Sequence, residues 1–258
     1  MLDRLDAMVL SNARSLVCYP NPSSPLCSKI IKELESRGIS HVISYGGFKI
    51  GGHSILGHGW AGNVFLAVSE KHGLLAVKSL HPKSRRRSML KEALMWLAAS
   101  RLHVAPQLFE ASRYFIAYKP ILGPRLADYR PRTQQEKAYT AARLLTKAHL
   151  LDTIGVRHGE LSRPHAQVLI DSCSSEPYII DYDSATLHTK PSNLPKIIGG
   201  LARIKAFRDC IDTIQVRPLL SHYKKRHETN ILIELKSIIL RKCLRPRQLF
   251  NQASKQSQ

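Results

Sequence analysis

The spacing of apolar residues divides the chain into a helical beginning, a strand-rich middle and a helical end. Residues 1–20 predict an amphipathic helix. Its apolar positions are Leu2, Leu5, Val9 and Leu16. A second predicted helix is capped by Ser28 and ends before Gly38, with an apolar stripe at Ile30, Ile31 and Leu34. Residues 39–80 then alternate in short runs separated by glycine turns, which is typical of strands.

The pattern beyond residue 80 mixes helices and strands. Residues 88–102 have a helical pattern and residues 104–122 a strand pattern. Thr133 with Glu136 fits a capping box that opens a helix running to about Leu151. Short apolar runs follow at 168–170 and 178–180, and mostly helical sequence follows Pro191, including 230–244. This order predicts an α+β fold, because a parallel sheet needs steadier β-α-β alternation.

We therefore expect two lobes flanked by two smaller segments. The predicted segments are an N-terminal helical extension (1–42), a β-rich lobe with one helix (43–119), a reduced helical lobe (120–248) and a polar tail (249–258).

The net charge of the chain indicates which kind of partner it could bind. The 39 Lys and Arg residues outnumber the 19 Asp and Glu residues, which leaves a formal net charge of +20. Basic clusters lie at 83–87, 224–226 and 241–247. Such runs are often solvated faces, but an excess of this size also favours contact with RNA or ribonucleoprotein, with a strong dependence on salt.

Cysteine usage and hydropathy suggest a location. The five cysteines are scattered, and none forms a C-x-x-C pair, so we expect neither a zinc site nor a disulfide framework. No apolar run approaches the ~20 residues that a membrane span requires. We therefore expect a reduced, cytoplasmic protein without a membrane partner.

A glycine motif occupies residues 57–64, which match G-x-G-x-x-G-x-V through Gly57, Gly59, Gly62 and Val64. A strand follows the motif, whereas a dinucleotide-binding motif would lead into a helix. A glycine loop between two strands can let backbone amides approach phosphate. A plain β-hairpin is the alternative interpretation of this motif.

A lysine and a glutamate follow at positions that allow them to pair. Lys78 ends an apolar strand, where an inward ammonium group would need a partner. Glu92 lies three residues after Met89 and four before Trp96, so it shares the buried face of its helix. A solvated acid beside a lysine that reaches into water is the alternative.

Two carboxylates come from short loops beside the two later strands. Glu160 precedes the strand at 168–170, and Asp181 directly follows the strand at 178–180. Phosphoryl transfer uses one carboxylate to orient the attacking hydroxyl and another to hold the metal on the phosphates. Between the lobes, residues 113–123 indicate a connection where adenine would pair with the Lys119 carbonyl and the Ile121 amide.

These segments together resemble the eukaryotic-type protein kinase superfamily over about residues 43–190. The glycine loop, strand lysine, helix glutamate, hinge and catalytic loop occur in the kinase order. Within that superfamily the chain resembles small archaeal predicted serine/threonine kinases, akin to RIO-type kinases and to the kinase subunit of the tRNA-threonylcarbamoylation complex. The resemblance implies a two-lobed kinase-like fold that uses ATP and Mg²⁺, or Mn²⁺ in its place.

The resemblance also implies roles for single residues. His158 would be a structural histidine, Glu160 the catalytic acid, and Lys78 and Glu92 the phosphate-positioning pair. Asp181, His165 and Asp183 would be metal ligands. Glu160 replaces the family's aspartate and adds one methylene, and a displacement of about 1 Å can cost roughly a hundredfold in rate. His165 replaces an asparagine, and imidazole prefers softer ions than Mg²⁺.

The expected activity is phosphorylation of a protein hydroxyl, with the protein itself as one candidate acceptor. Two alternatives remain open at this stage. One is a small-molecule kinase of the aminoglycoside-phosphotransferase type, to which the His-Gly-Glu order is also similar. The other is a nucleotide-binding pseudokinase or switch that docks on RNA.

Overall fold

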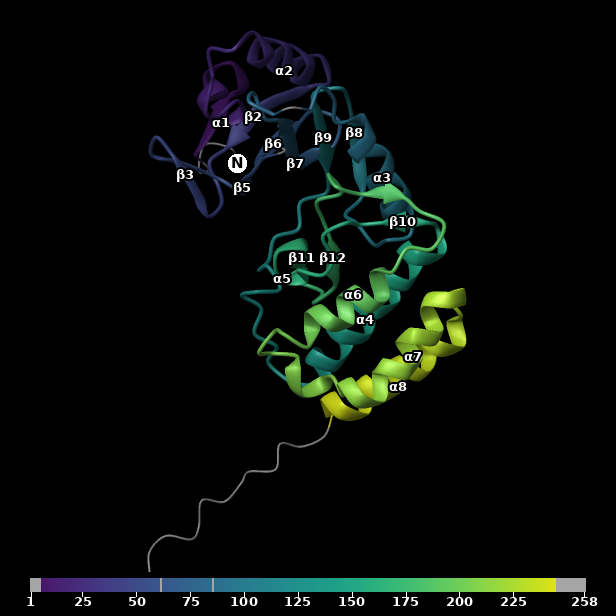
Figure 1. Cartoon of the computed structure of the whole chain (residues 1–258). Coiled ribbons are helices and arrows are strands. Elements are labelled where there is room, and N and C mark those ends of the chain that lie inside the picture. Colours follow the sequence, from purple (N-terminus) through teal and green to yellow (C-terminus); the bar gives the residue numbers. More distant parts are fainter. Residues whose placement is uncertain (1–5, 61, 85, 245–258) are drawn as a thin grey trace, which may run out of the picture.

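The computed structural model describes residues 6–60, 62–84 and 86–244. It is a mixed α+β protein with an antiparallel sheet in the N-terminal half and helices in the C-terminal half (Figure 1). The sheet of the described residues is open and forms no closed barrel. Several residues used in the sequence predictions lie outside the described ranges, namely Leu2, Leu5, Arg85, Arg245, Arg247 and the expected tail 249–258.

The large sheet follows the order β1-β2-β6-β7-β9-β8, and β5 pairs with β6. Its strands are β1 (Ala7–Val9), β2 (Ile39–Ile43), β5 (Gly57–His58), β6 (Gly62–Ser69), β7 (Gly73–Leu80), β8 (Leu108–Ala111) and β9 (Phe115–Tyr118). A separate hairpin joins β3 (Phe48–Ile50) to β4 (His53–Ile55) through Gly51 and Gly52, one of the glycine turns expected within residues 39–80.

The two faces of the sheet pack against different parts of the chain. Phe65 and Val77 belong to a core with the N-terminal segment, which includes α1 (Arg14–Val17) and α2 (Pro25–Ser36). Ala76 and Leu80 belong to a second core that includes α3 (Leu90–Arg101) and continues into the helical half. Because side chains alternate along a strand, Lys78 lies on the same face as Ala76 and Leu80. The sequence alternation thus places Lys78 toward the helical half.

The N-terminal segment differs from the prediction. Residues 7–9 form β1, which pairs with β2, and a 3₁₀ helix, η2 (Leu10–Ala13), and the short α1 follow. A single helix over residues 1–20 was therefore wrong for the described part, and this segment contributes β1 and β2 to the sheet. The N-cap of α2 is Ser24 rather than Ser28, because Pro25 takes the first helical position and the Ser24 hydroxyl accepts the Cys27 amide.

Four longer elements and a short 3₁₀ helix build the helical half. They are α4 (Gln134–Thr153), α6 (Asn193–Leu201), η3 (Arg208–Cys210), α7 (Thr213–Arg226) and α8 (Thr229–Leu244). The predicted capping residue Thr133 accepts the Glu136 amide at the start of α4. The Glu136 carboxylate accepts the Arg132 amide, one residue before the position that a capping box would use.

Short elements between α4 and α6 carry the loops of greatest interest. They are β10 (Val156–Arg157), α5 (Pro164–Gln167), β11 (Val168–Ile170), β12 (Pro177–Ile179) and β13 (Thr186–Leu187). β10 pairs with β13, and β11 pairs with β12.

Two disulfides correct the prediction made from cysteine spacing. Cys18 pairs with Cys27 near the start of α2, and Cys210 pairs with Cys243 between η3 and α8. The Cα atoms are 5.6 Å and 4.4 Å apart, and this proximity is set by the tertiary fold rather than by sequence spacing. None of the helices in the described part of the chain has both the length and the apolar character needed to cross a bilayer.

Candidate active site

The β11–β12 hairpin brings the Glu160 loop and Asp181 to one edge. Val168 pairs with Ile179, and the Ile180 amide donates to the Gln167 carbonyl. His158 joins the two loops, because its Nε2–H donates to the Ile180 carbonyl at 2.9 Å. Burial lowers the pKa of His158, so the imidazole is neutral with its proton on Nε2. The side chain therefore holds the loops together and is not placed to transfer a proton.

Lys78 contacts acids from both halves of the molecule. Its Nζ lies 2.6 Å from Oε1 of Glu92 on α3 and 2.7 Å from Oδ1 of Asp181. The Glu92 side chain is 1% exposed, whereas the Asp181 side chain is 39% exposed. The structure thus brings together the lysine, the helix glutamate and the aspartate that the sequence singled out.

The electrostatics of this cluster follow from burial and charge. Burial disfavours the Lys78 cation, but Glu92 and Asp181 outweigh this effect and raise the pKa of Lys78. Burial likewise opposes ionisation of Asp181, yet the nearby Lys78 ammonium lowers the pKa of this carboxyl. Burial raises the pKa of Glu92, with Lys78 acting against it. At neutral pH the cluster therefore contains a charged lysine facing an ionised Asp181.

Arg86 extends the cluster on the side of α3. Its guanidinium lies 3.4 Å from Oε2 of Glu92 and 3.2 Å from Oδ2 of Asp183, and it also donates to the Asp183 carbonyl. Sequence reasoning counted Arg86 only as part of a basic run, whereas the structure gives it specific partners. Asp183 therefore contacts this arginine and also borders the cleft.

The backbone beside the two acids has unusual conformations. Asp181 has φ +65°, a left-handed conformation that aspartate tolerates better than most residues. Gly159 has φ +82°, and a Cβ there would lie 2.5 Å from the Ser184 hydroxyl. The loop that carries Glu160 therefore packs tightly on the chain that follows Asp183. Such conformations cluster at functional sites.

Glu160 lies in the cleft and has two side-chain partners. Gln167 donates to Oε2 at 2.8 Å, and Arg163 lies 3.1 Å from Oε1. The predicted metal ligand His165 is exposed on α5 and lines neither of the two cavities described next. Gln167 lines the cleft instead, because the single turn of α5 brings the residue two positions later to the inside.

Two adjoining cavities lie between the sheet and the helical half. The larger has a volume of about 620 Å³, and the smaller about 280 Å³. Gly57, Val64, Tyr118, Arg125 and Ile180 line both cavities. Ile121 lines the larger one. The smaller one is lined by most of the predicted site residues: Gly59, Gly62, Lys78, Glu160, Asp181 and Asp183. Glu92 and Lys119 line neither cavity.

The glycines differ in what the fold requires of them. The motif lies on the hairpin formed by β5 and β6, as predicted, with Gly57 opposite Val64. A Cβ on Gly62 would lie 2.2 Å from the Ser79 carbonyl oxygen, so packing on β7 explains this glycine. A Cβ on Gly59 would meet nothing within 4 Å. Packing therefore does not explain Gly59.

The connection between the halves leaves backbone groups available beside the larger cavity. The Lys119 amide donates to the Gln107 carbonyl at 2.8 Å. Within the described residues, neither the Lys119 carbonyl nor the Ile121 amide has a backbone partner. These are the acceptor and donor that the sequence assigned to adenine recognition.

A cluster of aromatic side chains at the site was missed by sequence reasoning. Trp96 of α3 packs on Tyr118 at 4.3 Å between ring centroids and on Tyr182 at 5.6 Å. Tyr182 contacts His158 at 4.9 Å. This aromatic cluster connects β9, α3, the Asp181 segment and the Glu160 loop, and it holds the walls of the site in place.

A divalent ion would need ligands beyond the protein. Across the described ranges, no group of three or more His, Cys, Asp and Glu side chains could hold a metal. Mg²⁺ is usually held by one or two carboxylates together with substrate phosphates and water. Asp181 and Asp183, both lining the smaller cavity, fit that mode of binding.

Comparison of the chain with models of known protein families and with curated proteins finds no match.

Proposed function

We propose that this protein is an ATP- and Mg²⁺-dependent phosphotransferase with a two-lobed, protein-kinase-like fold. One observation carries the proposal: Lys78 from the sheet and Asp181 from the helical half meet at 2.7 Å beside Glu160, in a cavity that continues into a larger apolar one. The larger cavity suits a purine base, and the smaller one suits its phosphate chain. Phosphoryl transfer depends chiefly on such positioning and charge stabilisation.

Each group at the site has a role under this proposal. Lys78, held by Glu92, would contact the phosphates, and the glycine hairpin would cover them. Asp181 and Asp183 would hold Mg²⁺, which supplies positive charge against the phosphate oxygens. Glu160 would orient the acceptor hydroxyl, with Gln167 fixing one of its oxygens. The Lys119 carbonyl and the Ile121 amide would pair with the base.

The acceptor that we propose is a serine or threonine hydroxyl of a protein, including the protein itself. The net charge of +20 supports RNA or ribonucleoprotein as a further partner. A cytoplasmic location stays a prediction. The two disulfides count against it, because disulfides are uncommon in reduced compartments.

Incubation of the purified protein with γ-labelled ATP and Mg²⁺ or Mn²⁺ tests the proposal. Label should enter the protein or an added protein acceptor, and Asp181→Asn should abolish its transfer. Asp128→Asn is the matched control, since Asp128 is an exposed carboxylate of the helical half that lines neither cavity. Transfer to small alcohols alone would favour a small-molecule kinase. Equal transfer by the Asp181→Asn variant would refute the proposal.

A second candidate is a nucleotide-binding switch without transfer. It is favoured by the exposed position of His165 outside the cavities. The other two predicted metal ligands each have a cationic partner already, since Asp181 is paired with Lys78 and Asp183 with Arg86. Saturable Mg²⁺–ATP binding with no labelled product would support this candidate.

A further inference from the structure

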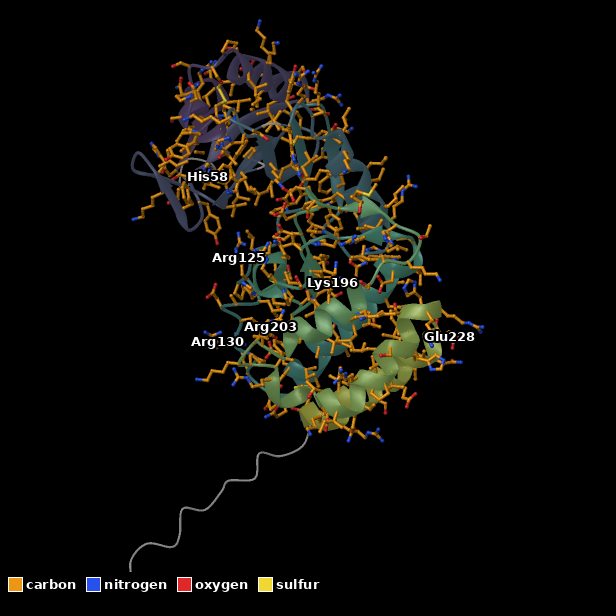
Figure 2. All side chains as sticks on the ribbon, viewed as in Figure 1. His58, Arg125, Arg130, Lys196, Arg203 and Glu228 are labelled. Carbon is orange, nitrogen blue, oxygen red and sulfur yellow. A yellow bond between two sulfur atoms is a disulfide. The ribbon has the colours of Figure 1, made fainter. Side chains whose placement is uncertain are left out.

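Arg125 lies where the two cavities join. It is one of the few residues that line both, and the only cation among them within the described chain. Figure 2 shows it below the glycine hairpin, which His58 marks, on the edge of the helical half. A ligand that extends from one cavity into the other would pass this side chain.

The backbone holds Arg125 in this place. Arg125 forms an antiparallel bridge with Leu169, and the Leu126 amide donates to the Val168 carbonyl at 2.9 Å. Gly123 makes the close approach possible, because a Cβ there would lie 1.8 Å from the Ile170 carbonyl oxygen. A larger residue at 123 would push the segment away from β11. The position of Arg125 is thus set by the same strand that supports the catalytic loop.

The guanidinium group retains unused hydrogen-bonding capacity. Its Nη1 donates to the Ala166 carbonyl at 2.9 Å, and its Nη2 lies 3.7 Å from where a Cβ on Gly57 would be. Lys78, Arg86 and Arg163 each contact a carboxylate, but Arg125 forms no ion pair with any described residue. A guanidinium with five N–H donors and no acid beside it is suited to an oxyanion.

We propose that Arg125 is an oxyanion-binding residue that holds the phosphate chain of the bound nucleotide from the helical side, opposite the glycine hairpin. This inference rests on the proposed function, in which the base fills the larger cavity and the chain runs toward Lys78. Arg125 lies between these two places, so the phosphate nearest the sugar is the group that it would contact. The residue then selects nucleotides over nucleosides.

Calorimetric or competition binding of adenosine, AMP and ADP to the full chain tests the inference. Arg125→Ala should weaken ADP and AMP binding about tenfold, as expected for loss of one charge-assisted contact, while adenosine binding stays unchanged. Arg125→Lys should recover part of the loss. Arg130→Ala is the matched control, because Arg130 is an exposed arginine of the same segment that binds only nearby carbonyls. Thermal melting of each variant checks folding.

The other possible binding results would overturn the inference or the proposed function. An equal loss of adenosine and ADP affinity would mean that Arg125 shapes the cavity without binding phosphate, and unchanged ADP affinity would also overturn the inference. Unchanged nucleotide affinity with slower transfer only to acidic acceptors would assign the oxyanion to the acceptor instead. If the wild-type protein binds none of the three ligands, the proposed function itself fails, which differs visibly from a defect confined to Arg125 variants.

Discussion

Two aspartates of the helical half, Asp152 and Asp181, have opposite surroundings. Asp152 at the end of α4 is 2% exposed and accepts four hydrogen bonds from neutral donors. These come from the Asn193 amide and side chain, the Leu194 amide and the Tyr223 hydroxyl. Asp181 contacts the Lys78 cation, and part of its side chain faces a cavity. A carboxylate can act on a ligand only where space and free lone pairs remain beside it.

The comparison explains why a buried acid alone does not mark a reactive site. Burial raises the pKa of Asp152, and hydrogen bonds from Leu194, Asn193 and Tyr223 act against this shift. Asp152 accepts the first two backbone amides of α6. The network continues through Asn193, whose side-chain oxygen accepts the His158 amide. Asp152 therefore supports the Glu160 loop from behind, while Asp181 lines the smaller cavity.

Exchanging each aspartate for asparagine should have a large effect, on activity in one variant and on stability in the other. Asp181→Asn should reduce phosphate transfer about a thousandfold, because charge stabilisation at the phosphates is lost. It should cost less stability than Asp152→Asn, because Lys78 keeps the buried Glu92 as its partner. Asp152→Asn should cost about 3 kcal/mol of stability, since one oxygen that accepts hydrogen bonds becomes a donor. Transfer assays and urea denaturation of both variants measure this. Similar losses of stability in the two variants would remove the distinction.

The Lys78–Glu92 pair is expected to serve both stability and activity. Lys78→Met should abolish transfer and also destabilise the fold by about 3–5 kcal/mol, because it removes a partner of a carboxylate that is almost fully buried. The double variant Lys78→Met/Glu92→Leu should recover much of the stability and none of the activity. Thermal denaturation with transfer assays checks this. A double variant as unstable as the single one would show that the buried charge is not the cause.

The two glycines Gly59 and Gly62 separate ligand contact from packing in the same hairpin. Gly62→Ala should lower stability by about 1–3 kcal/mol, because its Cβ would overlap the Ser79 carbonyl. Gly59→Ala should leave stability nearly unchanged and weaken nucleotide binding. Melting temperatures and ADP titrations measure the two effects. A Gly59→Ala protein with normal ADP affinity would mean that the loop does not approach the phosphates.

The smallest expected effect is on the pH dependence of stability, at Glu176. This carboxylate has charged partners and lies away from the cleft. Hydrogen bonds from Arg143, Lys147 and Tyr139 outweigh burial and lower its pKa from 4.5 to about 2. Because the folded pKa is depressed, this stabilisation is present above the unfolded pKa and is lost as the pH falls from 4.5 toward 2. Denaturation between about pH 3 and pH 6 should show a steeper loss for the wild type than for Glu176→Gln. Parallel pH curves would contradict this.

Sequence reasoning located the parts of the site that depend on local periodicity. Alternation along a strand was enough to turn Lys78 inward, and helical spacing from Met89 and Trp96 placed Glu92 on the buried face of α3. Asp181 followed from the end of an apolar strand. These positions depend on neighbours within one element, and a single sequence shows such neighbours.

The missed features depend on contacts between distant segments. Gln167 faces the cleft in place of His165 because α5 is one irregular turn. Arg125 reaches both cavities through its bridge to Leu169, 44 residues later. β1 forms by pairing with β2, more than 30 residues along the chain, and the disulfides bridge separate elements. No spacing rule within a single element predicts these contacts.

The most direct test of the account is the Mg²⁺ dependence of ADP binding, measured by calorimetry for the wild type, Asp181→Asn and Asp152→Asn. We expect Mg²⁺ to strengthen ADP binding in the wild type and in folded Asp152→Asn, but not in Asp181→Asn. If Mg²⁺ has no effect on wild-type binding, or strengthens binding to Asp181→Asn equally, Asp181 does not hold a metal on the phosphates and the account is contradicted.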